Sequence, residues 1–320
     1  MRAPTLLLAI ALSACGGGVP LEEVNGDPIA FVRQRASEGI VGITEFRRAL
    51  RIENEDEPGT LQRKRTTSVS LITVPTREIR TVPDLMPGSL PLDWTLDGMR
   101  LLIGERRGDA QSLSLKLWNR VTGAFDNITP GISDGLAALG PGPIRLVSVG
   151  PVIDASGSAS HGMRMHVARR HPRAVPGGRL GREPDVSADG RRVVFTRLRR
   201  GRSGRSPMLV LASLGGAEPV VLGRGSQPRF SRDGDWIVFV RVTRGVQNVW
   251  LMRSDGSAKR LVVQSSYDEV NPAVSPDGRH VVFASVRGGD KPESQLYLAR
   301  VADGQEIQLT RSGQNGRPVW

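Results

Sequence analysis

The 320-residue sequence has a single cysteine, Cys15, so no intramolecular disulfide can support its fold. Aromatic residues make up only 4% of the chain, and there are four histidines. The apolar run at residues 6–12 is too short to span a bilayer as a mature helix. Packing of short segments therefore has to stabilise the protein.

Glycine and proline, by contrast, are abundant. The chain has 38 Gly and 22 Pro with 38% hydrophobic residues, which suits many short strands and turns better than helices. The formal net charge is +12. Two explanations remain open for this charge: a solvated surface in an arginine-rich proteome, or an anionic partner.

The N-terminus is predicted to be an export signal, because Arg2 precedes the short apolar core. Residues 12–15, Leu-Ser-Ala-Cys, resemble a bacterial lipobox, whose cysteine is lipidated and becomes the first mature residue. We therefore expect a signal peptide at 1–14, then a lipidated Cys15 and a tether at 15–25. Gly16 resembles outer-membrane sorting, which predicts an outer-membrane lipoprotein facing the periplasm or the cell surface. The alternative is a plain secretory signal in which Cys15 is incidental.

A repeated segment organises the rest of the chain. Its copies read EPDVSADGRRVVF (183–195), QPRFSRDGDWIVF (227–239) and NPAVSPDGRHVVF (271–283). Asp-Gly between two apolar runs predicts a β-hairpin. The turn aspartates Asp189, Asp233 and Asp277 are 44 residues apart, a period typical of four-stranded propeller blades.

These copies resemble the propeller repeat of the TolB family, the periplasmic translocation proteins of the Tol system. The resemblance covers about residues 27–320 and implies six blades and a docking role. Propellers of this kind also serve as sugar lyases and as gating domains of peptidases, so the resemblance indicates the fold more strongly than the function. The sequence before the first blade is too short for the family's separate α/β domain, which argues against direct equivalence in a Tol complex.

The two ends of the chain are predicted to complete one blade. Residues 26–33 (GDPIAFVR) match the second strand at 234–241 (GDWIVFVR), and residues 317–320 (RPVW) match the start of an innermost strand. We therefore predict an all-β, six-bladed β-propeller over residues 26–320, closed by pairing of the C-terminal strand with the N-terminal blade. An insertion at about 34–65 is predicted to be either a decorated loop or a partner-binding arm. The least regular blade, the third, is expected within 135–175.

Candidate catalytic residues have structural explanations. The aspartates of the repeated turns are predicted to cap them: Asp97, Asp189, Asp233 and Asp277. Residues 131–135 fit G-x-S-x-G but lack the buried strand and the helix that this motif requires, so we expect an inter-blade loop. His161, His166 and His171 are five residues apart, which points neighbours to opposite faces of a strand. No metal site and no cofactor are predicted.

Two sets of residues are predicted to contact a partner, with ordinary solvation as the alternative for both. The first set opens the innermost strands near one mouth of the channel: Glu183, Gln227, Asn271 and Arg317. The second lies on the basic loop of the fourth blade: Arg197, Arg199, Arg200 and Arg202. The arginines have no accompanying aromatic platform, which argues against nucleic acid. An envelope protein or an acidic envelope component fits better, bound by a monomer.

The sequence thus predicts a lipid-anchored, non-catalytic protein-binding scaffold of the cell envelope. The alternative is a polysaccharide lyase or hydrolase that uses His161, His166 or His280 with channel arginines. A third possibility is a propeller subunit that needs another chain for activity. Histidines converging on the channel would favour the enzyme, and a basic rim without them would favour the scaffold.

Overall fold

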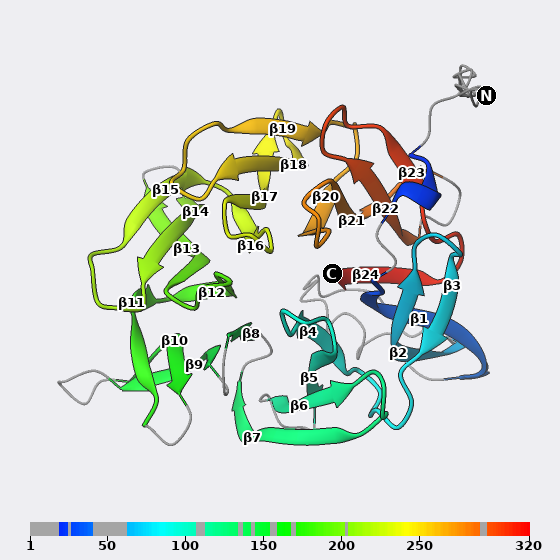
Figure 1. The fold of residues 1–320 in the computed structure, drawn as a ribbon, viewed down its shortest axis with the longest axis horizontal. Helices are drawn as coiled ribbons and strands as arrows, with labels where there is room; N and C mark the ends of the chain where they lie inside the picture. The colour runs from blue at the N-terminus through cyan, green and yellow to red at the C-terminus, as the bar shows by residue number, and fades with distance from the viewer. Residues whose placement is uncertain are drawn as a thin grey trace, which may run out of the picture.

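The computed structural model describes residues 19–24, 27–40, 63–106, 113–133, 137–141, 145–153, 159–167, 171–201, 204–288 and 293–320. In these ranges, a single 3-10 turn, η1 (Leu21–Glu23), accompanies 24 β-strands. The strands form six four-stranded antiparallel sheets arranged as a ring (Figure 1). The predicted all-β, six-bladed propeller is confirmed.

Each blade runs from an innermost to an outermost strand. The innermost strands are β24 (Gln314–Val319), β4 (Leu90–Trp94), β8 (Ala137–Gly140), β12 (Gly181–Val186), β16 (Ser226–Phe230) and β20 (Glu269–Val274). The second strands are β1 (Ile29–Ile40), β5 (Arg100–Arg106), β9 (Arg145–Ile153), β13 (Arg192–Gly201), β17 (Trp236–Thr243) and β21 (His280–Val286). The third strands are β2 (Arg63–Thr73), β6 (Leu113–Asn119), β10 (Ala159–Val167), β14 (Gly204–Ser213), β18 (Val246–Arg253) and β22 (Ser294–Arg300). The outermost strands are β3 (Glu78–Thr81), β7 (Phe125–Ser133), β11 (Arg173–Arg179), β15 (Val220–Arg224), β19 (Arg260–Val263) and β23 (Glu306–Gln308).

The first blade combines the two ends of the chain. Its strand order is β24-β1-β2-β3, with Ala30 opposite Val319 in the antiparallel ladder between β1 and β24. Two indole groups hold the end of β24 from either side. Trp320 Nε1 donates to Asp27 O at 3.0 Å, and Trp94 Nε1 donates to Val319 O at 3.3 Å. The last strand is therefore bonded to both the first and the second blade.

The second strands carry the core between blades. Phe31, Phe195, Phe239 and Phe283 occupy the same repeat position, and each is at most 1% exposed. Their apolar neighbours at 193–194, 237–238 and 281–282 are fully buried as well. Both faces of these strands are covered because blades stack side by side, as the continuous apolar runs predict. Each such side chain contributes roughly 1.5–3 kcal/mol of burial free energy.

The structure corrects two predictions about the N-terminal region. Val19 and Val24 are buried and belong to one core cluster with Ile29 and Leu309, so residues 19–24 are docked on the propeller and are not a free tether. The insertion predicted at 34–65 is partly a strand pair, because β1 and β2 extend into it. Residues 41–62 and Cys15 lie outside the described residues. No helix in the described ranges has the length and hydropathy to cross a bilayer.

The third blade has all four strands, β8 to β11, at the place that the spacing of the turn aspartates predicts. The G-x-S-x-G segment differs from the prediction. Residues 131–133 belong to β7, where Ser133 pairs with Leu113, and are not in an inter-blade loop. They form the outer edge of the second blade.

Closure makes Gly313 sensitive to substitution. Gly313 and Gly278 have φ values of 75° and 71°, so alanine at either site costs about 1–2 kcal/mol in backbone strain. A Cβ on Gly313 would also lie 2.6 Å from Gln34 O on β1, whereas one on Gly278 meets nothing within 4 Å. We expect Gly313→Ala to lower the free energy of unfolding by about 1–3 kcal/mol more than Gly278→Ala in urea denaturation. Equal losses would contradict the contact between the chain ends.

Candidate functional site

The meander of each blade gives the ring two different faces. We call the face with the repeated Ser-x-Asp-Gly turns, which join innermost to second strands, the turn face. The opposite face carries the hairpins between second and third strands and the connections between blades. We call it the hairpin face.

The repeated turns share one hydrogen-bond pattern. The Oδ1 atom of each turn aspartate accepts from a Ser or Thr hydroxyl at 2.5 Å and from the backbone N–H two residues later at 2.9 or 3.0 Å: Asp97, Asp189, Asp233 and Asp277. The hydroxyl bond holds the pKa of Asp97 and of Asp189 below the ordinary value. These carboxylates are committed to their own turns and do not converge.

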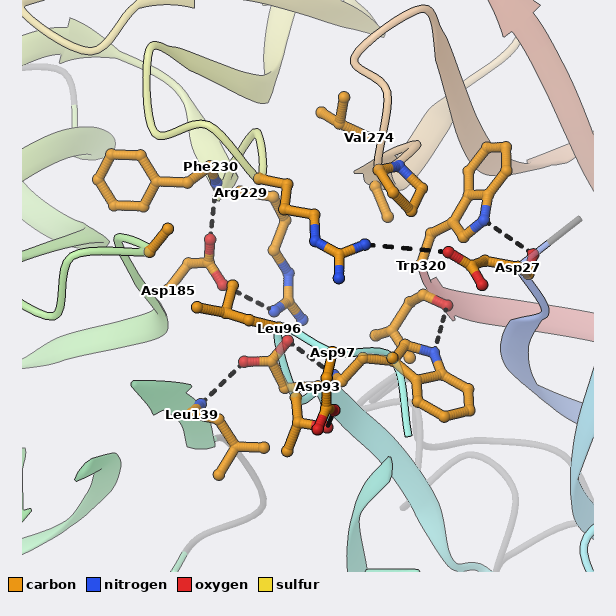
Figure 2. A pocket seen from close by; sticks show the side chains of 18 of the residues that line it. Asp27, Asp93, Leu96, Asp97, Leu139, Asp185, Arg229, Phe230, Val274 and Trp320 are labelled. Carbon is orange, nitrogen blue, oxygen red and sulfur yellow. Dashed lines mark hydrogen bonds and ion pairs between the residues drawn. The ribbon is translucent and has the colours of Figure 1, made fainter. Parts of the chain in front are cut away.

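A cavity of about 450 Å³ lies at the turn-face mouth of the channel (Figure 2). Trp94, Phe230 and Trp320 give it aromatic walls. The equivalent position one residue earlier on the innermost strand is occupied, from the first blade to the sixth, by Val319, Asp93, Ala138, Asp185, Arg229 and Ala273. Charge in the channel therefore comes from three of six equivalent positions.

Asp93, Asp185 and Arg229 form a connected group. Arg229 Nη1 lies 3.1 Å from Asp185 Oδ1, and Arg229 Nη2 donates to Leu92 O at 3.1 Å across the channel. Each carboxylate also accepts a backbone N–H from the following blade. Asp93 Oδ2 accepts from Leu139 N at 2.8 Å, and Asp185 Oδ2 accepts from Phe230 N at 2.6 Å (Figure 2).

Burial changes the acidity of this group. It raises the pKa of Asp93 to about 7, with the negative charge of Asp185 adding to the effect and Arg229 opposing it. Burial also raises the pKa of Asp185, again against the attraction of Arg229. The donors and acceptors of this group bind one another and the backbone.

The four polar residues that open the innermost strands share one backbone conformation. Glu183, Gln227, Asn271 and Arg317 all have left-handed backbone, with φ from 50° to 54°. Glu183 Oε2 accepts from Gln227 N at 2.8 Å, and Gln227 Oε1 accepts from Asn271 N at 2.6 Å. The side chains of Glu183 and Gln227 thus bond the next blade near the hairpin face, and none of the four residues lines the cavity.

The predicted basic loop is the hairpin between β13 and β14. Arg199 and Arg200 are exposed there, and Arg197 is half-buried with a 3.5 Å bond from Nη1 to Gly177 O. Arg202 lies outside the described residues. This hairpin belongs to the hairpin face, on the far side of the ring from the cavity.

The histidines do not converge on the channel. His166 Nε2 lies 2.8 Å from Ser148 Oγ inside the third blade, and burial lowers its pKa. His280 is buried in β21, while His161 and His171 are exposed. None of them lines the cavity. In the described part of the chain, no three His, Cys, Asp or Glu side chains are placed to hold a metal ion.

Sequence reasoning missed the channel group. Asp93, Asp185 and Arg229 precede the apolar residue that ends each innermost strand, where the other blades have Val319, Ala138 and Ala273. A charge at a repeat position otherwise filled by small or apolar residues is the signal that could have revealed them.

The pKa of Asp93 predicts a pH dependence of stability. The folded protein binds the Asp93 proton more tightly than the unfolded chain does. The contribution of Asp93 to the free energy of unfolding is therefore full below about pH 4 and is lost as pH rises through about 7. Measured against wild type, Asp93→Asn should therefore gain roughly 1–2 kcal/mol of unfolding free energy between pH 5 and pH 8. Asp97→Asn is the control and should show no such trend, because the pKa of Asp97 is lowered. Parallel pH profiles for Asp93→Asn and wild type would contradict the shifted pKa.

Comparison with known proteins agrees with this geometry. Residues 179–320 match the family model described as the TolB beta propeller domain, PD40. An uncharacterised protein of Agrobacterium fabrum is 40% identical over 63 residues, which are 20% of this chain and 22% of that protein. A TolB homolog of Chlorobium luteolum is 30% identical over 122 residues, 38% of this chain and 27% of that protein. The chain thus matches about a quarter of the length of these relatives.

Among solved structures, TolB from Acinetobacter baumannii superimposes with a TM-score of 0.65. The match covers 94% of this chain and 68% of that one at 18% sequence identity, a level that speaks for the fold alone. Residues 179–320 therefore match the TolB propeller domain, and the chain as a whole shares the six-bladed propeller fold.

Proposed function

We propose that the protein is a non-catalytic docking scaffold of the cell envelope that binds a polypeptide at the turn-face mouth of its channel. One observation carries the proposal. The charged groups Asp93, Asp185 and Arg229 are bonded to one another or to the backbone, and Trp94, Phe230 and Trp320 line the cavity beside them. Such a site offers apolar contact and little free acid–base chemistry.

The rim of the cavity suits a polypeptide partner. Leu96 is 43% exposed and lines the opening beside Trp94 and Trp320. Asp27 lies 3.6 Å from Arg120 and 3.9 Å from Arg232, which gives the edge both charge signs. Aromatic and aliphatic side chains beside polar and charged ones are a usual composition of a protein interface.

The lyase or hydrolase alternative has less support. It requires histidines at the channel mouth, and the four histidines lie elsewhere. Asp93 has a pKa near neutrality, but both of its oxygens accept backbone N–H groups, from Trp94 and Leu139. A carboxyl group held in this way connects two blades and is poorly placed to shuttle a proton.

The envelope location rests on the N-terminal motif and on the family. Acylation of Cys15 would hold the propeller at a membrane, and several acyl chains give stable anchoring. Because residues 19–24 are docked on the propeller, the anchor would keep the domain close to the bilayer. We propose an outer-membrane lipoprotein that acts as a monomer.

Leu96 and its neighbour Met99 provide a matched test of partner binding. Both are exposed apolar residues near one turn, at 43% and 40%, but only Leu96 lines the cavity. In affinity purification from envelope extracts, we expect Leu96→Glu to reduce recovery of a specific partner about tenfold and Met99→Glu to leave it unchanged. Glutamate at position 96 would replace an apolar contact with the partner by a charged group.

Two outcomes would contradict the docking proposal. One is a partner that is recovered equally with Leu96→Glu and with wild type. The other is turnover of an acidic polysaccharide by the purified protein, with loss of the activity in Asp93→Asn.

The anchor has its own test. We expect Cys15→Ala to move the protein from the membrane fraction to the soluble envelope fraction, because no acyl chains are attached. Fractionation and immunoblotting measure the change, with Ser13→Ala as a control for processing. Unchanged association of Cys15→Ala with membranes that are washed in about 1 M salt, which screens electrostatic binding, would show that Cys15 is not the anchor.

A further inference from the structure

The hairpin face carries apolar side chains at the tips of separate loops. Val242, Tyr267 and Val286 are 59%, 41% and 45% exposed. Met86 and Leu180 are exposed as well, in the connections between the first and second blades and between the third and fourth. Five of the ten large, exposed apolar side chains of the described residues therefore lie on this face.

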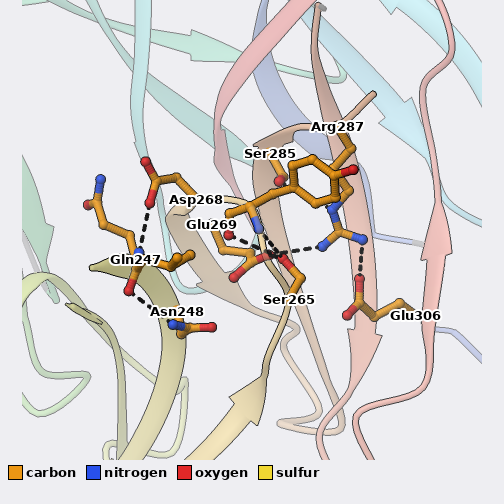
Figure 3. Close-up of polar contacts among 10 residues, drawn as sticks. Gln247, Asn248, Ser265, Asp268, Glu269, Ser285, Arg287 and Glu306 are labelled. Carbon is orange, nitrogen blue, oxygen red and sulfur yellow. Dashed lines mark hydrogen bonds and ion pairs between the residues drawn. The ribbon is translucent and has the colours of Figure 1, made fainter. Parts of the chain in front are cut away.

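Polar contacts join the loops that carry the first three of these side chains (Figure 3). Asp268 Oδ1 accepts from Gln247 N at 2.7 Å, which ties the Tyr267 loop to the hairpin that carries Val242. On the other side, Arg287 Nη2 lies 3.1 Å from Glu269 Oε1, which ties the same loop to the hairpin that carries Val286. Arg244 and Gly245 form a tight two-residue turn with φ of 55° and 86°. Little ordering would be needed when this surface binds.

The same face is strongly basic. Its exposed arginines include Arg199, Arg200, Arg205, Arg224, Arg244 and Arg311. No carboxylate of the described residues lies within ion-pair distance of these six. Asp84 and Asp268 are the exposed acids on the described loops of this face, and Asp268 is already bonded to Gln247. The described loops of this face therefore place exposed arginines, without an ion-pair partner among the described residues, beside exposed apolar tips.

We propose that the hairpin face lies on an anionic lipid bilayer, with the arginines among the headgroups and the apolar tips in the interface. A protein hot spot is usually one desolvated cluster. Here the apolar tips are distributed among the connections and hairpins of several blades, and a bilayer can contact all of them together. Tyrosine and arginine suit the headgroup region, and basic residues add attraction to anionic lipid.

This inference goes beyond the proposed function and uses the opposite face of the ring. If the hairpin face rests on the membrane, the turn-face cavity points away from it and stays open to a partner. Either proposal can fail without the other, because the cavity is tested by a substitution at Leu96 and membrane binding by substitutions on the hairpin face.

Vesicle partitioning tests the proposal. The full chain is mixed with vesicles of phosphatidylcholine alone or with phosphatidylglycerol, and the bound fraction is measured by co-sedimentation at about 0.1 M salt. The ratio of the two partition coefficients cancels the charge-independent part of any contribution from the N-terminal segment. We expect this ratio to be about tenfold or more and to fall at high salt.

Matched variants locate the contact. Arg199→Ser with Arg200→Ser should reduce the ratio about tenfold. Arg191→Ser with Arg279→Ser removes the same charge from the exposed turn face and should leave the ratio unchanged. Tyr267→Ser should weaken binding to the phosphatidylglycerol vesicles severalfold, whereas Val121→Ser, far from the hairpins, should not.

Three results would overturn the proposal. The first is a ratio near one for the wild-type protein, a result that does not depend on whether any variant folds. The second is an equal loss for the hairpin and turn-face arginine pairs, which would show attraction by net charge alone. The third is capture of an acidic protein that depends on Arg199 and Arg200 while vesicles do not bind.

Discussion

The hydrogen bonds between β24 and β1 join residues 314–319 to residues 30–34. They close the six sheets into a ring, because β24 is the innermost strand of the first blade. An open ring would expose unpaired strand edges, which favour aggregation. The turn-face cavity depends on the same pairing, because Val319 and Trp320 form part of its wall.

Side chains near the channel reinforce this ring from blade to blade. Glu183 and Gln227 bond the backbone of the next blade near the hairpin face, and Asp93 and Asp185 do so near the turn face. Buried carboxylates are costly unless they are paired and hydrogen-bonded. Arg229 and the backbone N–H groups supply those partners, and the raised pKa of Asp93 reflects the desolvation that remains. The main role of these polar side chains at the channel is therefore to hydrogen-bond one blade to the next.

The sequence predicted the fold well because its signals are local and repeated. The Asp-Gly turns and the buried Val-Val-Phe runs recur every 44 residues, and the match between GDPIAFVR and GDWIVFVR located the second strand of the first blade. The contacts between blades were harder to predict from the sequence. Glu183 and Gln227 were expected to face a partner, but their side chains bond neighbouring blades across 44 residues. Such contacts depend on how blades stack, which no single repeat encodes. The docking of Val19 and Val24 on the core was missed for the same reason.

The ring presents two chemically different faces, a turn face with an aromatic cavity and a hairpin face whose described loops carry exposed arginines and apolar tips. Both depend on closure, and hydrogen–deuterium exchange of β24 tests closure most directly. We expect the amides of residues 314–319 that pair with β1 to exchange as slowly as those of the equivalent strand β20, opening only when the whole domain unfolds. Exchange within seconds, as at a free C-terminus, would contradict the closed ring.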